Sequence, residues 1–293
     1  MSISSKFHVL VMLSFLVAVQ LIALAITPAI SATDNRVFED PASISNPIIY
    51  MLLILIFTAI LLLAIKLKGD WLVRGFILIS IALTIFYVIS AIMPMWLALL
   101  PTLAVMLLLH YYPEWYILDA FGILVCAAVT SLLGVSMTVM PVIILMVILA
   151  VYDAISVYKT RHMVALAEGA IKMKAPLLFV VPKSRGYSFR RKDAVSISMG
   201  NDKKKGDRGA YFLGMGDAII PSILVISASW SYPPGDILGL NLPALGAMLG
   251  TYAGFILLMT TSRDRPQAGL PFLNSGSILG FLAGCLAAGI QPF

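Results

Sequence analysis

The sequence predicts an all-α polytopic membrane protein with about nine transmembrane helices. Of the 293 residues, 60% are hydrophobic and only 12% are charged, and the mean hydropathy is +0.99. Apolar runs of roughly 20 residues recur along the chain, which is the length that a helix needs to cross a bilayer. A soluble domain does not have this composition.

Nine apolar runs give the expected helices. They cover residues 8–29, 48–65, 75–93, 95–109, 116–134, 139–158, 211–230, 241–261 and 270–290. The fourth run is short for a span, and Pro94 and Pro101 interrupt its neighbourhood. The first run ends near a stretch, residues 29–32, that resembles a signal-peptidase site, so a cleaved signal peptide is the alternative to a retained first helix. We favour the retained helix, because the run is longer than a usual signal core.

The distribution of basic residues predicts the orientation. Most of the lysines and arginines outside the runs lie in even-numbered loops. The odd-numbered loops are mainly acidic and carry Asp34, Glu39, Asp40 and Asp236, with Arg36 as their single cation. By the positive-inside rule, the N-terminus is cytoplasmic and the C-terminus lies outside. The net charge of +6 therefore reflects topology and contact with the lipid bilayer, and we expect no nucleic-acid partner.

The chain divides into three parts. Residues 1–158 contain helices one to six, residues 159–210 form a cytoplasmic basic loop, and residues 211–293 contain helices seven to nine. In the loop, the apolar spacing of residues 160–174 predicts a short amphipathic helix on the membrane surface. Residues 177–181 are strand formers between two prolines, and alternation around residues 195–199 is a weaker strand signal.

Small residues are spaced by four in the last two runs, at Gly246, Gly250 and Gly254 and at Gly276, Gly280 and Gly284. Such faces permit close helix packing, within the fold or in a homo-oligomer. The two cysteines lie inside apolar runs, so neither a disulfide nor a zinc site is expected.

Two aspartates lie inside apolar runs, and a carboxylate at that depth is a candidate for a functional site. Asp153 lies six residues before Lys159, and Asp217 lies six residues after Tyr211, where its run begins. At ~1.5 Å per helical residue, both would lie about 9 Å from the same membrane face. Neighbouring helices would thus place the two carboxyl groups at one level.

Two such carboxyl groups in a low-dielectric site would share one proton. The ionised member can take a proton from water while the protonated member polarises a scissile carbonyl, so peptide hydrolysis needs neither a metal nor another cofactor. Gly214 and Gly216 would leave room for a substrate backbone beside Asp217. Pro221 removes a helical donor in the same run and is expected to bend it.

Other chemistries have less support. The chain has no His-Glu-x-x-His and no Gly-x-Ser-x-Gly, and its three histidines lie at or near the ends of runs. Asp119, beside Trp115 and Tyr116, is interpreted as a residue of the membrane boundary. Two alternatives stay open: a transporter or cation leak channel in which the aspartates relay protons or ions, and a prepilin-type Gly-x-Gly-Asp peptidase.

Tyr152-Asp153, Gly214-Met215-Gly216-Asp217, nine spans and the long loop between the motifs resemble the presenilin/signal peptide peptidase family. The likeness covers nearly the whole chain and is greatest to a microbial (archaeal) presenilin homologue. It implies an intramembrane aspartyl endopeptidase that acts on transmembrane-helix peptides in a prokaryotic plasma membrane. Asp153 and Asp217 would be its catalytic pair, with Tyr152 beside them.

The family's third signature, Pro-Ala-Leu at the start of the last helix, implies a substrate-binding role for Ala268, Gly269, Leu270 and Pro271. Leu270 and Pro271 match, whereas Ala268 and Gly269 stand where proline and alanine are expected. A literal Pro-Ala-Leu at residues 243–245 lies one span early, on the outer side, and is interpreted as a coincidence.

A substrate helix must unwind before water can reach its peptide bonds, and its freed backbone groups then need partners. The residues near 177–181, or the backbone just before Gly214, are expected to offer a strand edge to that segment, with residues 268–271 opposite.

Overall fold

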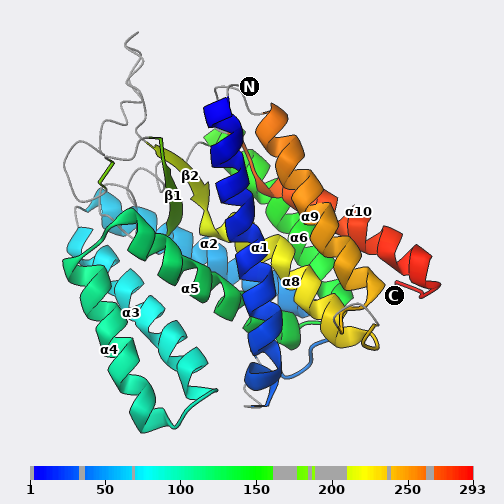
Figure 1. Cartoon of the computed structure of the whole chain (residues 1–293), viewed down its shortest axis with the longest axis horizontal. Helices are drawn as coiled ribbons and strands as arrows, with labels where there is room; N and C mark the ends of the chain where they lie inside the picture. Colours follow the sequence, from blue (N-terminus) through cyan, green and yellow to red (C-terminus); the bar gives the residue numbers. More distant parts are fainter. Residues whose placement is uncertain are drawn as a thin grey trace.

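The computed structural model shows a bundle of α-helices with one small β-sheet at one end (Figure 1). It describes residues 3–32, 37–67, 70–160, 177–183, 187–188, 210–235, 239–261 and 267–292. Nine α-helices lie in these ranges: α1 (Ile3–Ser31), α2 (Ser45–Lys66), α3 (Asp70–Ser90), α4 (Met95–Tyr111), α5 (Trp115–Ser136), α6 (Val139–Ile155), α8 (Met215–Ser231), α9 (Leu242–Thr261) and α10 (Leu270–Ala288). A π-helical turn, η1 (Ser156–Thr160), follows α6, and the sheet consists of β1 (Leu178–Pro182) and β2 (Ala210–Gly214).

Seven of these helices are long and apolar enough to cross a membrane, by length and composition, and α4 and α8 are shorter apolar helices. The expected helical, multi-pass membrane fold is therefore confirmed for the described ranges. The fourth run, although short, forms a helix that keeps Pro101 inside it.

One expected helix begins later than the hydropathy suggests. The apolar run that starts at Tyr211 was expected to be helical throughout, but residues 210–214 form strand β2 and the helix begins at Met215. A short apolar run of this kind is compatible with a strand or with a helix, and Gly214 and Gly216 disfavour a helix at its start. The helical rise used to estimate the depth of Asp217 therefore does not apply to residues 211–214, since a strand advances ~3.3 Å per residue.

The basic loop is described only in part. Strand β1 agrees with the strand expected at residues 177–181, and it pairs with β2 in antiparallel register, Leu178 opposite Gly214 and Pro182 opposite Ala210. The amphipathic helix expected at residues 160–174 and the strand signal at residues 195–199 lie outside the described residues.

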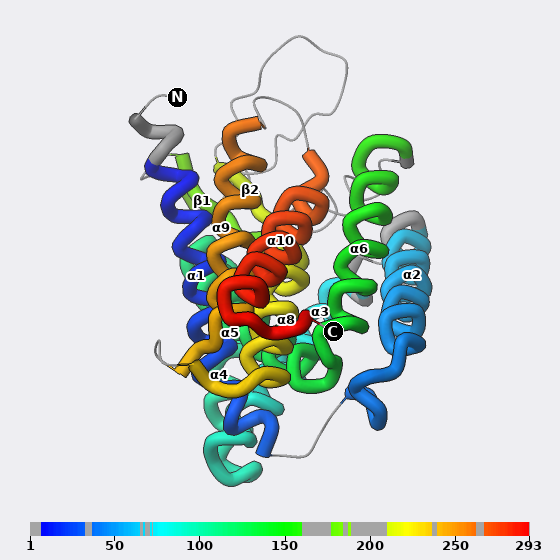
Figure 2. Tube along the Cα trace, turned by 90° about the vertical axis from the view of Figure 1, so that its right-hand side faces the viewer, coloured from blue at the N-terminus to red at the C-terminus, as the bar shows by residue number. Residues whose placement is uncertain are grey.

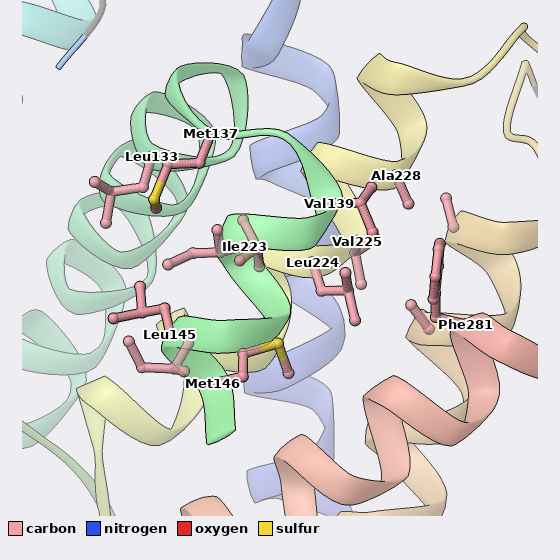
Figure 3. Packing of buried hydrophobic residues seen from close by; sticks show 14 of the residues in the cluster. Leu133, Met137, Val139, Leu145, Met146, Ile223, Leu224, Val225, Ala228 and Phe281 are labelled. Atoms are coloured by element: carbon pink, nitrogen blue, oxygen red, sulfur yellow. The ribbon is translucent and has the colours of Figure 1, made fainter. Parts of the chain in front are cut away.

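The largest buried cluster joins the helices that carry the two aspartates (Figure 3). Leu145 and Met146 of α6 pack with Ile223 and Leu224 of α8, and Phe281 of α10 adds to the cluster. Because lipid tails are as apolar as these side chains, van der Waals packing between fitted surfaces is what holds the helices together. This packing fixes the spacing of α6, α8 and α10.

The small-residue faces of the last two helices pack on each other. A β-carbon on Gly246 would lie 2.1 Å from the carbonyl oxygen of Gly280, and one on Gly250 would lie 2.1 Å from that of Gly276. No side chain fits at these contacts, so the glycines serve the fold itself. These faces are therefore not available to a second copy of the chain.

The sheet lies at the end of the bundle where α1 begins, and α10 slopes away from that end toward the right-hand side of the view (Figure 1). Helix α1 packs along α5 and supplies Leu16 and Val19 to the interior. Helix α2 stands beside α6 at the edge of the bundle (Figure 2).

Candidate active site

Asp153 lies near the end of α6 and faces the interior of the bundle. The residue is 6% exposed, and its Oδ2 accepts a hydrogen bond from the amide of Leu270 at 3.2 Å. The α-helix ends two residues later and continues as η1, where Ser156 Oγ donates to the carbonyl of Asp153 at 2.9 Å. Turns of π-helix occur often at functional sites. Here the turn fixes the backbone that carries the carboxyl group.

Asp217 lies in the first turn of α8. Gly214, the residue before this helix, has an extended backbone (φ −63°, ψ 134°), so strand β2 leads directly into the helix. The free amides and the positive end of the helix dipole favour a carboxylate at this position. The side chain is half-buried.

The two carboxyl groups approach the same peptide unit, Gly269–Leu270, at the start of α10. The amide of Leu270 donates to Asp153, and a β-carbon on Gly269 would lie 2.9 Å from Oδ2 and 3.0 Å from Cγ of Asp217. Two aspartates from different helices are thus brought together at one point.

The segment of residues 268–271 lies beside the two aspartates. Ala268 is fully buried, Gly269 and Leu270 contact the two aspartates, and Pro271 lies in the first turn of α10. Gly269 has an ordinary helical backbone (φ −79°, ψ −43°), so it is the lack of a side chain that matters there.

The two glycines of the second motif have different surroundings. A β-carbon on Gly214 would lie 3.2 Å from Asp217 Oδ2, whereas one on Gly216 would have no atom within 4 Å. Only Gly216 therefore opens onto free space next to Asp217.

Tyr152 and Asp153 are neighbours in the chain, but their side chains have different partners. The hydroxyl of Tyr152 is hydrogen-bonded to Thr58 of α2, whereas Asp153 is bonded to α10. Tyr152 thus links the aspartate-bearing end of α6 to its outer neighbour.

A second tyrosine, which the sequence did not single out, reaches the segment before α10. The hydroxyl of Tyr158 donates to Gln267 Oε1 at 3.2 Å and accepts from the amide of Ala268 at 3.4 Å. Tyr158 belongs to η1, and nothing in its local sequence distinguishes this π-helical turn from a continued α-helix.

Two polar residues of α10 also tie it to the aspartate-bearing helices. Asn274 Nδ2 donates to the carbonyl of Met146 on α6 at 2.8 Å, and Ser277 Oγ donates to that of Pro221 on α8 at 3.3 Å. Polar residues three apart in an apolar run are the signal that would have identified them.

Asp119, which the sequence suggests is a residue of the membrane boundary, is buried against the sheet. The residue is 3% exposed, and its Oδ1 accepts the amide of Val180 in β1 at 2.8 Å. The adjacent Trp115 and Tyr116 suggested an interface, but the partner lies in a strand far along the chain and could not be foreseen.

The arrangement has the parts that acid–base chemistry needs. Two carboxyl groups that share one proton supply a base and an acid within reach of one bond. Among the described residues, no three His, Cys, Asp or Glu side chains are grouped so as to hold a metal ion.

The literal Pro-Ala-Leu at residues 243–245 lies far from this site. A β-carbon on Gly284, near the end of α10, would lie 2.9 Å from the α-carbon of Pro243. The aspartates are at the other end of α10, beside Leu270.

Comparison with known proteins gives a consistent result. The profile of the family described as signal-peptide peptidase, presenilin aspartyl protease matches residues 13–290. Two solved structures of a presenilin family intramembrane aspartate protease are similar to this chain, each with 34% sequence identity and a TM-score of 0.67. The one in the C222 space group is matched over 95% of this chain and 97% of its own, and the one in P2 over 94% and 96%. A comparison with curated proteins gives no match. These findings do not favour a transporter, a leak channel or a prepilin-type peptidase.

Proposed function

Because this chain belongs to the signal-peptide peptidase and presenilin aspartyl protease family, we propose that it hydrolyses peptide bonds within membrane-spanning segments, with Asp153 and Asp217 as its catalytic pair. The chain is an integral multi-pass membrane protein and an aspartic protease by family. The observation that supports this pair of residues is the approach of both carboxyl groups to the Gly269–Leu270 peptide.

In the proposed reaction, the ionised carboxylate takes a proton from a water molecule as that water attacks the scissile carbonyl. The protonated carboxyl group donates a hydrogen bond to the carbonyl oxygen and stabilises the charge that develops there. The two groups then exchange roles, so that the leaving amine receives a proton. The amide of Leu270 holds Asp153 in a fixed orientation for this exchange.

We further propose that the outer edge of β2 receives the unwound substrate. The amide of Met215 donates to the carbonyl of Leu177 at 3.2 Å, which sets the alternation of the antiparallel ladder. By that alternation, Phe212 directs its amide and carbonyl away from β1. A segment added to this edge would have its backbone groups satisfied and would run toward Asp217.

The open space beside Gly216 suits the same path. A substrate backbone that follows β2 reaches the start of α8, where no protein atom would contact a β-carbon of Gly216. Close approach of a backbone to the aspartates requires such an unoccupied position.

Substrate polarity and location follow from the predicted orientation. A cytoplasmic N-terminus and an outer C-terminus imply presenilin-like polarity, with substrates whose own N-terminus lies outside. The proposed location is a prokaryotic plasma membrane, and the proposed substrates are transmembrane-helix peptides.

The test is incubation of the purified protein with a synthetic transmembrane peptide, followed by mass spectrometry of the products. Asp153→Asn and Asp217→Asn keep the size of each side chain and remove its acid, so each should lower the cleavage rate by roughly a hundredfold or more. Both variants should still bind the peptide. Cleavage at the wild-type rate by either variant, or ion flux through proteoliposomes with no peptide fragments, would contradict the proposal.

A further inference from the structure

A third aspartate of the bundle, Asp119, lies outside the proposed catalytic pair. Asp119, in the second turn of α5, is 3% exposed, and its Oδ1 accepts the amide of Val180 at 2.8 Å. Its second oxygen, Oδ2, is buried and has no hydrogen-bond partner among the described residues. An unpaired buried carboxylate oxygen costs stability and offsets part of what the bond to Val180 contributes.

The bond from Val180 lies on the edge of β1 that faces away from β2. The alternation set by the Met215–Leu177 bond turns the backbone groups of Leu178, Val180 and Pro182 outward. Asp119 therefore occupies a position on β1 that a further strand would otherwise take.

A second side chain occupies the same edge. Nε2 of His8 in α1 donates to the carbonyl of Pro182 at 3.1 Å, and Pro182 itself has no amide hydrogen to offer. The outer edge of β1 is thus closed at two successive outward-facing residues, Val180 and Pro182.

Helix α5 also contacts the backbone that leads to Asp217. A β-carbon on Gly122 would lie 2.3 Å from Cε of Met215 and 3.2 Å from Phe179, so this glycine lets both side chains rest on the helix. One turn later, Cys126 Sγ donates to the carbonyl of Met215 at 3.8 Å. Asp119, Gly122 and Cys126 lie on one face of α5. There they contact the antiparallel pair β1–β2, here called the hairpin, and Met215, which follows it.

We propose that Asp119 is a positioning residue for peptide-bond cleavage, which closes the outer edge of β1 and fixes the hairpin on α5. This inference rests on the proposed function. By blocking β1, Asp119 leaves β2 as the edge for the substrate strand, and by fixing the hairpin it sets which substrate bond lies beside Asp217. The carboxylate acts as a hydrogen-bond acceptor, and its charge is not required.

The experiment compares two conservative variants in the full-length protein. Asp119→Asn keeps an acceptor at the place of Oδ1, whereas Asp119→Glu keeps the charge and moves the acceptor by one methylene. Both are incubated with one transmembrane peptide, and mass spectrometry gives the rate and the position of each cut. Thr130→Val, which removes a buried hydroxyl without a partner on the same helix, is the matched control.

We expect Asp119→Asn and Thr130→Val to keep the dominant cut and a kcat/KM within about threefold of the wild type. We expect Asp119→Glu to spread the cuts over neighbouring bonds and to lower kcat/KM by about tenfold. Val180→Pro removes the amide that Asp119 accepts and leaves the bonds to β2, so it should give the same spread. Its effect should not add to that of Asp119→Glu.

An unchanged cut pattern in Asp119→Glu, or a loss in Asp119→Asn equal to that in Asp119→Glu, would overturn this inference alone. A wild-type protein that cuts no peptide would overturn the proposed function and this inference with it.

Discussion

Substitution of the two glycines beside Asp217 should separate effects on the chemical step from effects on substrate binding. Gly214→Ala would place a β-carbon 3.2 Å from Asp217 Oδ2, so it should displace the carboxyl group and lower kcat. Gly216→Ala meets no atom within 4 Å, so it should leave the protein folded and raise KM by filling the space that a substrate backbone needs. Steady-state kinetics with one fluorogenic transmembrane peptide measure both parameters.

These two variants act as controls for each other, because each adds one methyl group to the same motif. A rise in KM without a change in kcat for Gly214→Ala, or the reverse for Gly216→Ala, would contradict the assigned surroundings.

The proposed catalytic pair also predicts how the cleavage rate depends on pH. At low pH both carboxyl groups are protonated and no base remains, and at high pH both are ionised and no acid remains. The cleavage rate should therefore give a bell-shaped profile, whose two limbs belong to the pair and not to Asp153 or Asp217 singly. Initial rates in buffers of constant ionic strength test this, and a profile with a single limb would count against shared proton chemistry.

Among single residues, the sequence best identifies candidates for a functional site when a charged side chain lies within an apolar run. Asp153 and Asp217 are identifiable because an acid within an apolar run has no ordinary explanation. The contact of Asp119 with the sheet is missed because the aromatic residues beside it, at the end of an apolar run, suggest a place at the membrane interface. Its partner Val180 is also 61 residues away in the chain. Tyr158 is missed because its position depends on a π-helical turn.

Helices α9 and α10 offer a test of packing at the scale of elements. Gly250→Ala would place a β-carbon 2.1 Å from the backbone oxygen of Gly276, which no side-chain motion relieves. Overpacking of this kind should destabilise the protein by about 1–3 kcal/mol. Gly75→Ala in α3, where no atom lies within 4 Å, should instead stabilise it by about 0.5–1 kcal/mol.

Thermal unfolding in one detergent, followed by circular dichroism, compares the two variants directly. Equal midpoints for the two variants would show that the α9–α10 contact is looser than the glycine distances indicate.

Among the elements, the long helices are predictable because an apolar segment of about 20 residues can satisfy its own backbone groups in a bilayer only as a helix. The start of α8 is not, because the apolar residues 211–213 suit a strand or a helix equally, and only pairing with β1 decides between them. Strand β1 was predictable because prolines bound it.

For the molecule as a whole, the sequence predicts the membrane-spanning helices but not which of them adjoin. That the start of α10 should lie between the carboxyl groups of α6 and α8 depends on fitted packing among Leu145, Leu224 and Phe281, which has no periodic signature. The resemblance to a known family supplied that arrangement, and residue patterns did not.

The orientation of the whole molecule gives a final prediction. The start of α1 and the β-hairpin lie at one end of the bundle, and α10 slopes away from that end (Figure 1). The basic residues of the even-numbered loops assign the hairpin end to the cytoplasm, because cations are retained on that side. A tag placed after Phe293 should thus be digested by protease added outside intact spheroplasts, whereas a tag before Met1 should be protected until the cells are lysed. The reverse pattern would place the catalytic pair near the outer face and would require substrates of the opposite polarity.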